Sequence, residues 1–168
     1  QSLSYDRFIL ATGSTGYMPP ISGLKDYGFS VSTLADAEKL DQHLKSLANK
    51  PISAARNTVV VAGGGLTGLE TVAEMPERLR SILAETDIRV VLVDSSIEIG
   101  AALGDEAAVV IREALSELGV EGKAGLRVTA LDASGVTLSN GERIETETVI
   151  WTAGMRANSL TSQIVGEK

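Results

Sequence analysis

The chain has 168 residues, of which 43% are hydrophobic, and a formal net charge of −7 at pH 7. This length fits one domain, or one domain with flanking pieces, and the apolar content is sufficient for a core. The acidic balance argues against nucleic acid and anionic membrane surfaces as partners. No apolar run approaches the ~20 residues of a membrane span, and the absence of cysteine excludes disulfides, thiolate metal sites and a redox-active cysteine pair within this sequence.

The first 31 residues predict one short strand and a linker. The apolar run Phe8–Leu10 followed by the glycine turn at 11–14 is typical of a strand and its end. This strand has no partner before it in the sequence, so we expect the chain to be part of a longer protein. Residues 15–31 contain Pro19-Pro20 and several glycines, which favour an irregular linker.

A surface helix is predicted after this linker. Ser32 or Thr33 can cap it, and Pro51 should follow its end. Its apolar residues recur at spacings of three and four and form one stripe: Leu34, Ala37, Leu40, Leu44 and Leu47. His43, the only histidine, falls on the polar face, which indicates a surface residue rather than a ligand.

The most informative stretch is 59–70, which reads VVVAGGGLTGLE. The β-branched run in 58–62 predicts a buried strand, and a helical pattern from Leu66 to about Ala84 follows the glycines. The three glycines of a G-x-G-x-x-G motif allow a tight turn, close approach of a pyrophosphate, and close packing of the helix on the strand. Amides of the first helical turn then face the phosphates. The predicted phosphate loop comprises Gly63, Gly64, Gly65, Leu66, Thr67 and Gly68.

An acid at the end of the next strand completes the dinucleotide pattern. The run 88–93, IRVVLV, predicts a central parallel strand and leads into Asp94, whose carboxylate can accept the ribose hydroxyls of an adenosine. Ser95 and Ser96 follow at the place where an NADPH site needs arginine, so we expect NADH to be preferred over NADPH. The alternative is an ordinary βα turn with Asp94 as a strand-end cap, but the order strand, motif, helix, acid favours dinucleotide binding.

The remaining sequence predicts one more helix and then short strands. Asp105-Glu106 open the helix and Gly119 ends it. Its apolar positions are Val110, Ile111, Ala114, Leu115 and Leu118. A short strand is expected at Val120-Glu121.

From Leu126 the hydrophobic period changes to two. It predicts antiparallel strands at 126–131, 136–139 and 142–145, with a hairpin turn at Asn140-Gly141. The run 148–151 is the last strand, which ends at the turn 152–154, and Trp151 is expected in the core.

The predicted fold class is α/β. The expected architecture is a Rossmann-like parallel sheet of order 3-2-1-4 with helices on both faces, in which a three-stranded antiparallel meander replaces the last crossover helix. The carboxyl ends of the first and fourth strands should then bring the glycine loop, Asp94 and the 152–154 turn around one crevice.

The motifs resemble those of the two-dinucleotide-binding-domain flavoproteins, the pyridine nucleotide-disulfide oxidoreductase superfamily, and especially type II NADH dehydrogenases. The resemblance rests on YDRFILATGS (5–14), ISGLKDYGFSVSTLADAEKLDQHL (21–44), VVVAGGGLTGLETVAEMPERL (59–79) and TVIWTAGM (148–155). It implies that 30–154 is an NAD(H)-binding domain inserted in an FAD domain. Residues 1–29 would then be an edge of the FAD domain and a linker, and 155–168 would be a tail that re-enters it.

Site roles follow from the same resemblance. The glycine loop would hold the NAD(H) pyrophosphate, and Asp94 with Ser95 the adenosine ribose. Glu70, expected in the first helical turn, would lie near the nicotinamide together with Ala153 and Gly154, and Thr12-Gly13 would touch the flavin side. Hydride would pass from the nicotinamide to the flavin, so neither a catalytic side chain nor a metal is assigned.

The intact protein would use FAD and an electron acceptor, of which quinone is the family's example. It would be cytoplasmic or peripheral at the inner face of the membrane. The sequence contains one glycine motif, so this chain alone should neither retain FAD nor turn over. Two alternatives are a stand-alone NAD(H)-binding sensor without turnover and the NAD domain of a ferredoxin-reductase-like flavoprotein.

Overall fold

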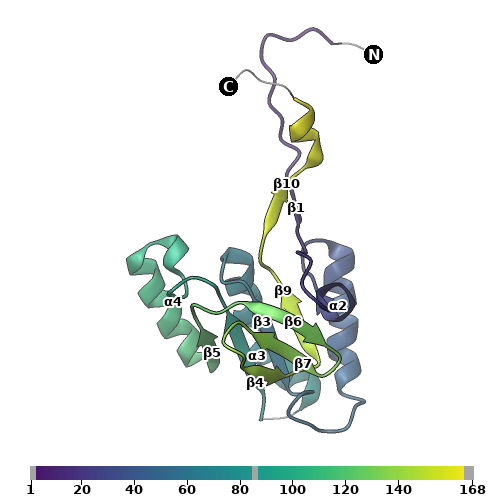
Figure 1. The fold of residues 1–168 in the computed structure, drawn as a ribbon, viewed down its shortest axis with the longest axis vertical. Coiled ribbons are helices and arrows are strands. Elements are labelled where there is room, and N and C mark those ends of the chain that lie inside the picture. Colours follow the sequence, from purple (N-terminus) through teal and green to yellow (C-terminus); the bar gives the residue numbers. More distant parts are fainter. Residues whose placement is uncertain (1–2, 85–86, 165–168) are drawn as a thin grey trace.

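The body of the molecule is built on a five-stranded parallel sheet (Figure 1). A computed structural model describes residues 3–84 and 87–164. The strands lie in the order β2 (Gly28–Phe29), β9 (Thr148–Trp151), β3 (Thr58–Ala62), β4 (Arg89–Val93) and β5 (Val120–Lys123). Strands β5-β4-β3-β9 confirm the predicted order 3-2-1-4. Strand β2 adds a fifth member beside β9; a two-residue strand within a glycine- and proline-rich segment gives no periodic signal.

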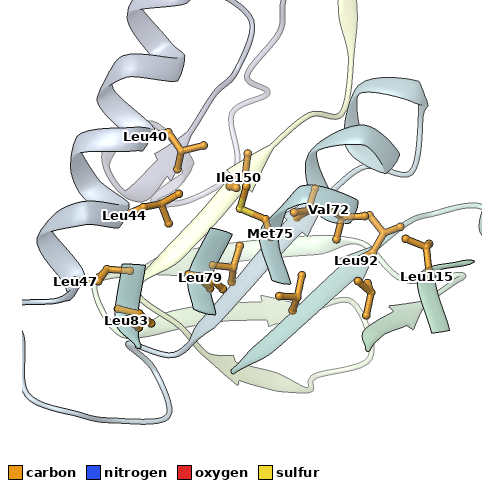
Figure 2. Close-up of a cluster of buried hydrophobic side chains, with 14 of the residues drawn as sticks. Leu40, Leu44, Leu47, Val72, Met75, Leu79, Leu83, Leu92, Leu115 and Ile150 are labelled. Carbon is orange, nitrogen blue, oxygen red and sulfur yellow. The ribbon is translucent and has the colours of Figure 1, made fainter. Parts of the chain in front are cut away.

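Three helices cover one face of this sheet: α2 (Leu34–Leu47), α3 (Leu66–Leu83) and α4 (Asp105–Glu117), the last preceded by the 3₁₀ turn η1 (Ala101–Leu103). Alternate residues of β3, Val59 and Val61, point into this layer, as the period of two requires. Figure 2 shows how the helices meet in one cluster of apolar side chains. The cluster contains Leu40, Leu44, Leu47, Val72, Met75, Leu79, Leu83, Leu92, Leu115 and Ile150.

The opposite face carries the antiparallel meander and one short helix. The meander consists of β6 (Val128–Asp132), β7 (Gly135–Leu138) and β8 (Arg143–Glu145), close to the predicted bounds, and the helix is α1 (Leu24–Tyr27). The other residues of β3, Val60 and Ala62, pack against this layer. On this face the helical cover predicted from the sequence is therefore limited to the four-residue helix α1, because the meander takes the place of a crossover helix.

A two-stranded arm extends from the body (Figure 1). Strand β1 (Ser14–Gly16) pairs antiparallel with β10 (Met155–Ala157), and the 3₁₀ helix η2 (Ser159–Gln163) follows. The predicted strand at Phe8–Leu10 is wrong: 8–10 have no regular structure, and Ile9 is 87% exposed. A strand needs a ladder partner, and β10 pairs with 14–16 instead. Residues 1–2 and 165–168 of the predicted flanking segments lie outside the described residues.

Packing corrects the surface position predicted for His43 and shows which apolar residues of α4 are buried. Thr33 caps α2 as expected, but His43 on that helix is half-buried against Phe29, with ring centroids 4.3 Å apart. Its Nε2 lies 2.9 Å from Thr148 Oγ1. Strand β2, absent from the sequence prediction, places Phe29 beside the helix and widens the buried face. In α4 the inner positions are Ala108 and Leu115, with Ile111 partly buried; Val110, Ala114 and Leu118 are exposed.

No helix in the described part of the chain is both long enough and apolar enough to cross a membrane.

Candidate functional site

The glycine loop is a tight connection between β3 and α3. At two of its glycines, neighbouring atoms leave no room for a side chain. Gly63 has φ +113°, and a Cβ there would lie 2.8 Å from the backbone nitrogen of Ala153. A Cβ on Gly68 would lie 2.7 Å from Thr152 Oγ1 and closer still to the carbonyl oxygen of Gly63. The roles expected for the first and third glycines, a turn and close helix packing, therefore match the geometry.

Gly65 differs because the space in front of it is open. No atom of the described residues lies within 4 Å of the position that a Cβ would occupy, and its φ of −72° suits any residue. Gly65 is the N-cap of α3, and no side chain caps that helix end. Helix N-terminal amides are normally satisfied by a cap, by water or by a ligand. The combination of open space and an uncapped helix end is what a bound pyrophosphate requires.

Asp94 lies at the carboxyl end of β4 and faces this loop. One of its carboxylate oxygens, Oδ2, accepts a hydrogen bond from Gly64 N–H, and Oδ1 accepts one from Ser96 N–H at 2.6 Å. A Cβ on Gly64 would lie 2.9 Å from the Asp94 carboxyl carbon, so a side chain there would displace the Asp94 carboxylate. Asp94 thus fixes the middle of the glycine loop, a structural role that the sequence did not reveal, while it remains partly exposed.

The predicted single crevice is divided into two cavities. The first, which we call the adenosine-side cavity, has a volume of about 240 Å³. It lies where β3, β4 and β9 end and brings Gly63, Asp94 and Ser95 together with Ala153, which was expected beside Gly154 at the nicotinamide end. Its other lining residues are Ile21, Ala62, Val93, Leu126, Arg127, Val128 and Trp151. A volume below the ~300 Å³ lower range of whole ligand pockets suits one half of a dinucleotide.

The second cavity, of about 310 Å³, lies between the body and the base of the arm. It contains Thr67 and Gly154 from the predicted site, together with Thr152. Trp151 lines both cavities and is only half-buried, and its Nε1 donates to the carbonyl of Tyr17 at 3.1 Å. The expectation that Trp151 lies in the core is therefore corrected: it forms a wall shared by both cavities.

Besides Gly64, Gly65, Leu66 and Gly68 of the glycine loop, three predicted site residues line neither cavity: Glu70, Thr12 and Gly13. Glu70 is exposed and falls in the second turn of α3, whose first turn carries no acid, so the expected first-turn position is wrong. The helix begins at Leu66, as predicted, so its first turn is 66–69 and Glu70 is its fifth residue. Thr12 and Gly13 lie beyond β1 on the arm, where their carbonyls accept hydrogen bonds from Asn158 at 3.4 and 3.1 Å.

Arg127 lines the adenosine-side cavity and was missed by sequence reasoning. It lies 33 residues after Asp94, at the start of the meander, and nothing in the local sequence marks it. Backbone hydrogen bonds from Leu126 N–H to Asp94 O, at 3.0 Å, and from Gly125 N–H to Ser96 O, at 2.7 Å, bring the two segments together.

Comparison with known proteins identifies the family. The sequence pattern of the family described as "Pyridine nucleotide-disulphide oxidoreductase" matches residues 1–166. The chain belongs to this family. The expected resemblance is thereby confirmed.

Individual relatives point in the same direction. The chain is 48% identical over 166 residues to an NADH dehydrogenase-like protein of Mycobacterium tuberculosis, covering 97% of this chain and 42% of that protein. It is 27% identical over 172 residues to a type II NADH:quinone oxidoreductase of Staphylococcus haemolyticus, covering 95% and 43%. The chain therefore spans about two fifths of the length of these relatives.

A solved structure confirms the fold. NDH2 of Plasmodium falciparum, in complex with NADH, has a TM-score of 0.78 and 20% sequence identity, and the match covers 94% of this chain and 36% of that one.

Proposed function

We propose that residues 30–154 bind NADH as the NAD(H) domain of an FAD-dependent NADH dehydrogenase. The observation that carries the proposal is the uncapped, open N-terminus of α3 at Gly65, directly beside Asp94. Relatives named as NADH dehydrogenase-like proteins and NADH:quinone oxidoreductases support it. Residues 1–29 and 155–168 would form an edge of the flanking FAD domain.

The residues present suit a dinucleotide. The free amides at the start of α3 hold the pyrophosphate through backbone groups, so the acidic net charge of the chain is no obstacle. Asp94 keeps an acceptor available for the adenosine ribose, since each carboxylate oxygen has two lone-pair positions and one amide contact. Its negative charge disfavours a 2′-phosphate, so NADH should bind more tightly than NADPH.

Orientation is the contribution of this chain to the reaction. When both cofactors are bound, they supply the redox chemistry, in which a hydride passes from nicotinamide to flavin. The cavity between Thr67, Trp151 and the base of the arm is where the nicotinamide half would be held, facing the flanking domain. Quinone as the final acceptor, and attachment of the whole protein to the inner face of the membrane, belong to the same proposal.

Replacing Gly65 with valine tests the nucleotide site. The Cβ of the new side chain enters open space among the described residues, so the variant should fold, but the side chain should fill the space of the pyrophosphate and abolish NADH binding measured by calorimetry. Ala114→Val, which adds the same side chain at an exposed position of α4, is the matched control and should bind as the parent chain does. Unchanged NADH affinity in folded Gly65→Val would refute the site.

A further inference from the structure

The residues that line the adenosine-side cavity include one acidic and one basic residue, Asp94 and Arg127, on two neighbouring segments. The two segments are joined by the backbone hydrogen bonds of Gly125 and Leu126 to Ser96 and Asp94. On its other side the backbone of Arg127 is held by Ser139, whose Oγ accepts from Arg127 N–H at 3.1 Å and whose N–H donates to Arg127 O at 2.8 Å. The backbone of Arg127 is therefore fixed at this wall.

The Arg127 side chain is exposed and available. Within residues 3–84 and 87–164 its guanidinium has neither an ion-pair nor a hydrogen-bond partner. Asp94 does not neutralise it, because the Asp94 carboxylate accepts from the amides of Gly64 and Ser96 instead. Arg127 thus lines the same cavity as Asp94, and the donors of its guanidinium have no partner among the described residues.

A second basic side chain near this end of the sheet, that of Lys123, already forms ion pairs. Lys123 ends β5, and its Nζ lies 2.9 Å from carboxylate oxygens of both Glu121 and Glu142. Hydrogen bonds to these two carboxylates raise the pKa of Lys123, so it stays charged and paired. Lys123 does not line the adenosine-side cavity, which leaves Arg127 as the cation that can reach a ligand there.

We infer that Asp94 and Arg127 form an opposed pair that sets the coenzyme preference of the site. The carboxylate disfavours a phosphate on the ribose 2′ position, and the guanidinium attracts it, because its planar donors match phosphate oxygens. The inference rests on the proposed function. With Arg127 present, the ratio of NADH to NADPH affinity should be smaller than Asp94 alone would give. Arg127 is therefore a specificity-determining residue.

The test is a cycle of variants in the 168-residue chain, with NADH and NADPH affinities measured by calorimetry. Arg127→Gln should raise the ratio of NADH to NADPH affinity by roughly tenfold, the effect of one charge-assisted hydrogen bond. Asp94→Asn, which keeps an acceptor for Gly64 N–H, should lower that ratio by a similar factor. The double variant should lose most of the NADPH binding that Asp94→Asn gains.

Arg143→Gln is the matched control. It removes the same charge from the same meander, but Arg143 pairs with Asp132 and does not line the cavity, so the affinity ratio should stay as in the parent chain. Adenosine 2′,5′-bisphosphate and 5′-AMP are probes of the adenosine half alone. Arg127→Gln should weaken the first more than the second.

Two results would count against the proposal in different ways. Equal loss of both coenzymes in Arg127→Gln, or no change in either, would overturn the opposed pair while leaving the nucleotide site intact. Failure of the parent chain to bind any of the four nucleotides would overturn the proposed function, and this inference with it.

Discussion

Gly68→Ala should destabilise the body through the contact between α3 and the β3 turn. The added methyl carbon would lie 2.7 Å from Thr152 Oγ1 and 2.9 Å from the carbonyl carbon of Gly63. Carbon atoms are normally separated by about 3.5 Å or more, so the contact with the carbonyl carbon alone requires a shift of about 0.6 Å, and the carbonyl oxygen of Gly63, which lies closer still, requires a larger one. The obstacle includes backbone, which cannot rotate away as a flexible side chain could.

The magnitude follows from two opposing terms. Overpacking a close contact costs roughly 1–3 kcal/mol, and backbone obstruction places this site at the upper end. Alanine recovers about 1 kcal/mol through its better helix propensity. The net loss of unfolding free energy should be about 1–2 kcal/mol, which lowers the Tm of a chain of this length by roughly 2–8 °C.

Thermal and urea unfolding of the parent chain, Gly68→Ala and Gly65→Ser provide the assay. Gly65→Ser is the control in the same loop, because serine meets no neighbour there and is a favoured N-cap; its stability should equal or slightly exceed that of the parent. A Gly68→Ala variant as stable as the parent would refute the packing argument. So would an equal loss in both variants, since it would show that any side chain in the loop is harmful.

Three further outcomes are expected. The purified 168-residue chain should be colourless and should leave NADH unoxidised with ferricyanide present; a yellow preparation with stoichiometric FAD would show that the glycine motif belongs to the other dinucleotide. Binding of NADH should quench the fluorescence of Trp151, the only tryptophan, in a saturable way, because this ring lines both cavities; an unchanged spectrum at saturation would contradict the placement. Burial, and to a lesser extent Lys50, lowers the pKa of His43, so the unfolded chain binds the proton more readily. Stability should therefore fall as the pH drops below about 6.5, and His43→Gln should flatten urea midpoints between pH 7.5 and 5; parallel pH profiles would contradict this.

The parts of the fold that were predictable carry strong local signals. The strand at 58–62 and the helix from Leu66 follow from a β-branched run, three glycines and a 3.6-residue period. The dipeptide Asn140-Gly141 predicts a hairpin turn because both residue types tolerate positive φ, and Gly141 takes a φ of +85°. The sheet order then follows from right-handed crossovers, which leave few alternatives.

The parts that were not predictable depend on contacts between distant segments. Strand β2 forms because Gly28 and Phe29 meet β9, more than a hundred residues away, and its presence is what buries His43. Arg127 joins the site only because the chain after β5 returns past Asp94. Trp151 lines both cavities, and its Nε1 donates to the carbonyl of Tyr17, a residue 134 positions earlier in the chain. Each of these contacts joins residues far apart in the sequence, so no local hydrophobic pattern predicts it.

The narrow ribbon of β1 and β10 has a consequence for engineering. The chain enters the body along β1 and leaves it along β10, and these strands pair in the register Ser14↔Ala157 to Gly16↔Met155. Where the ribbon meets the body, Tyr17 N–H donates to Gly154 O at 3.1 Å. A body whose entry and exit points adjoin can be spliced into a surface hairpin of an unrelated carrier without stretching either protein. We expect residues 14–157 to fold when inserted into such a carrier protein. The length of the two-stranded ribbon would then set how far the inserted domain lies from the carrier.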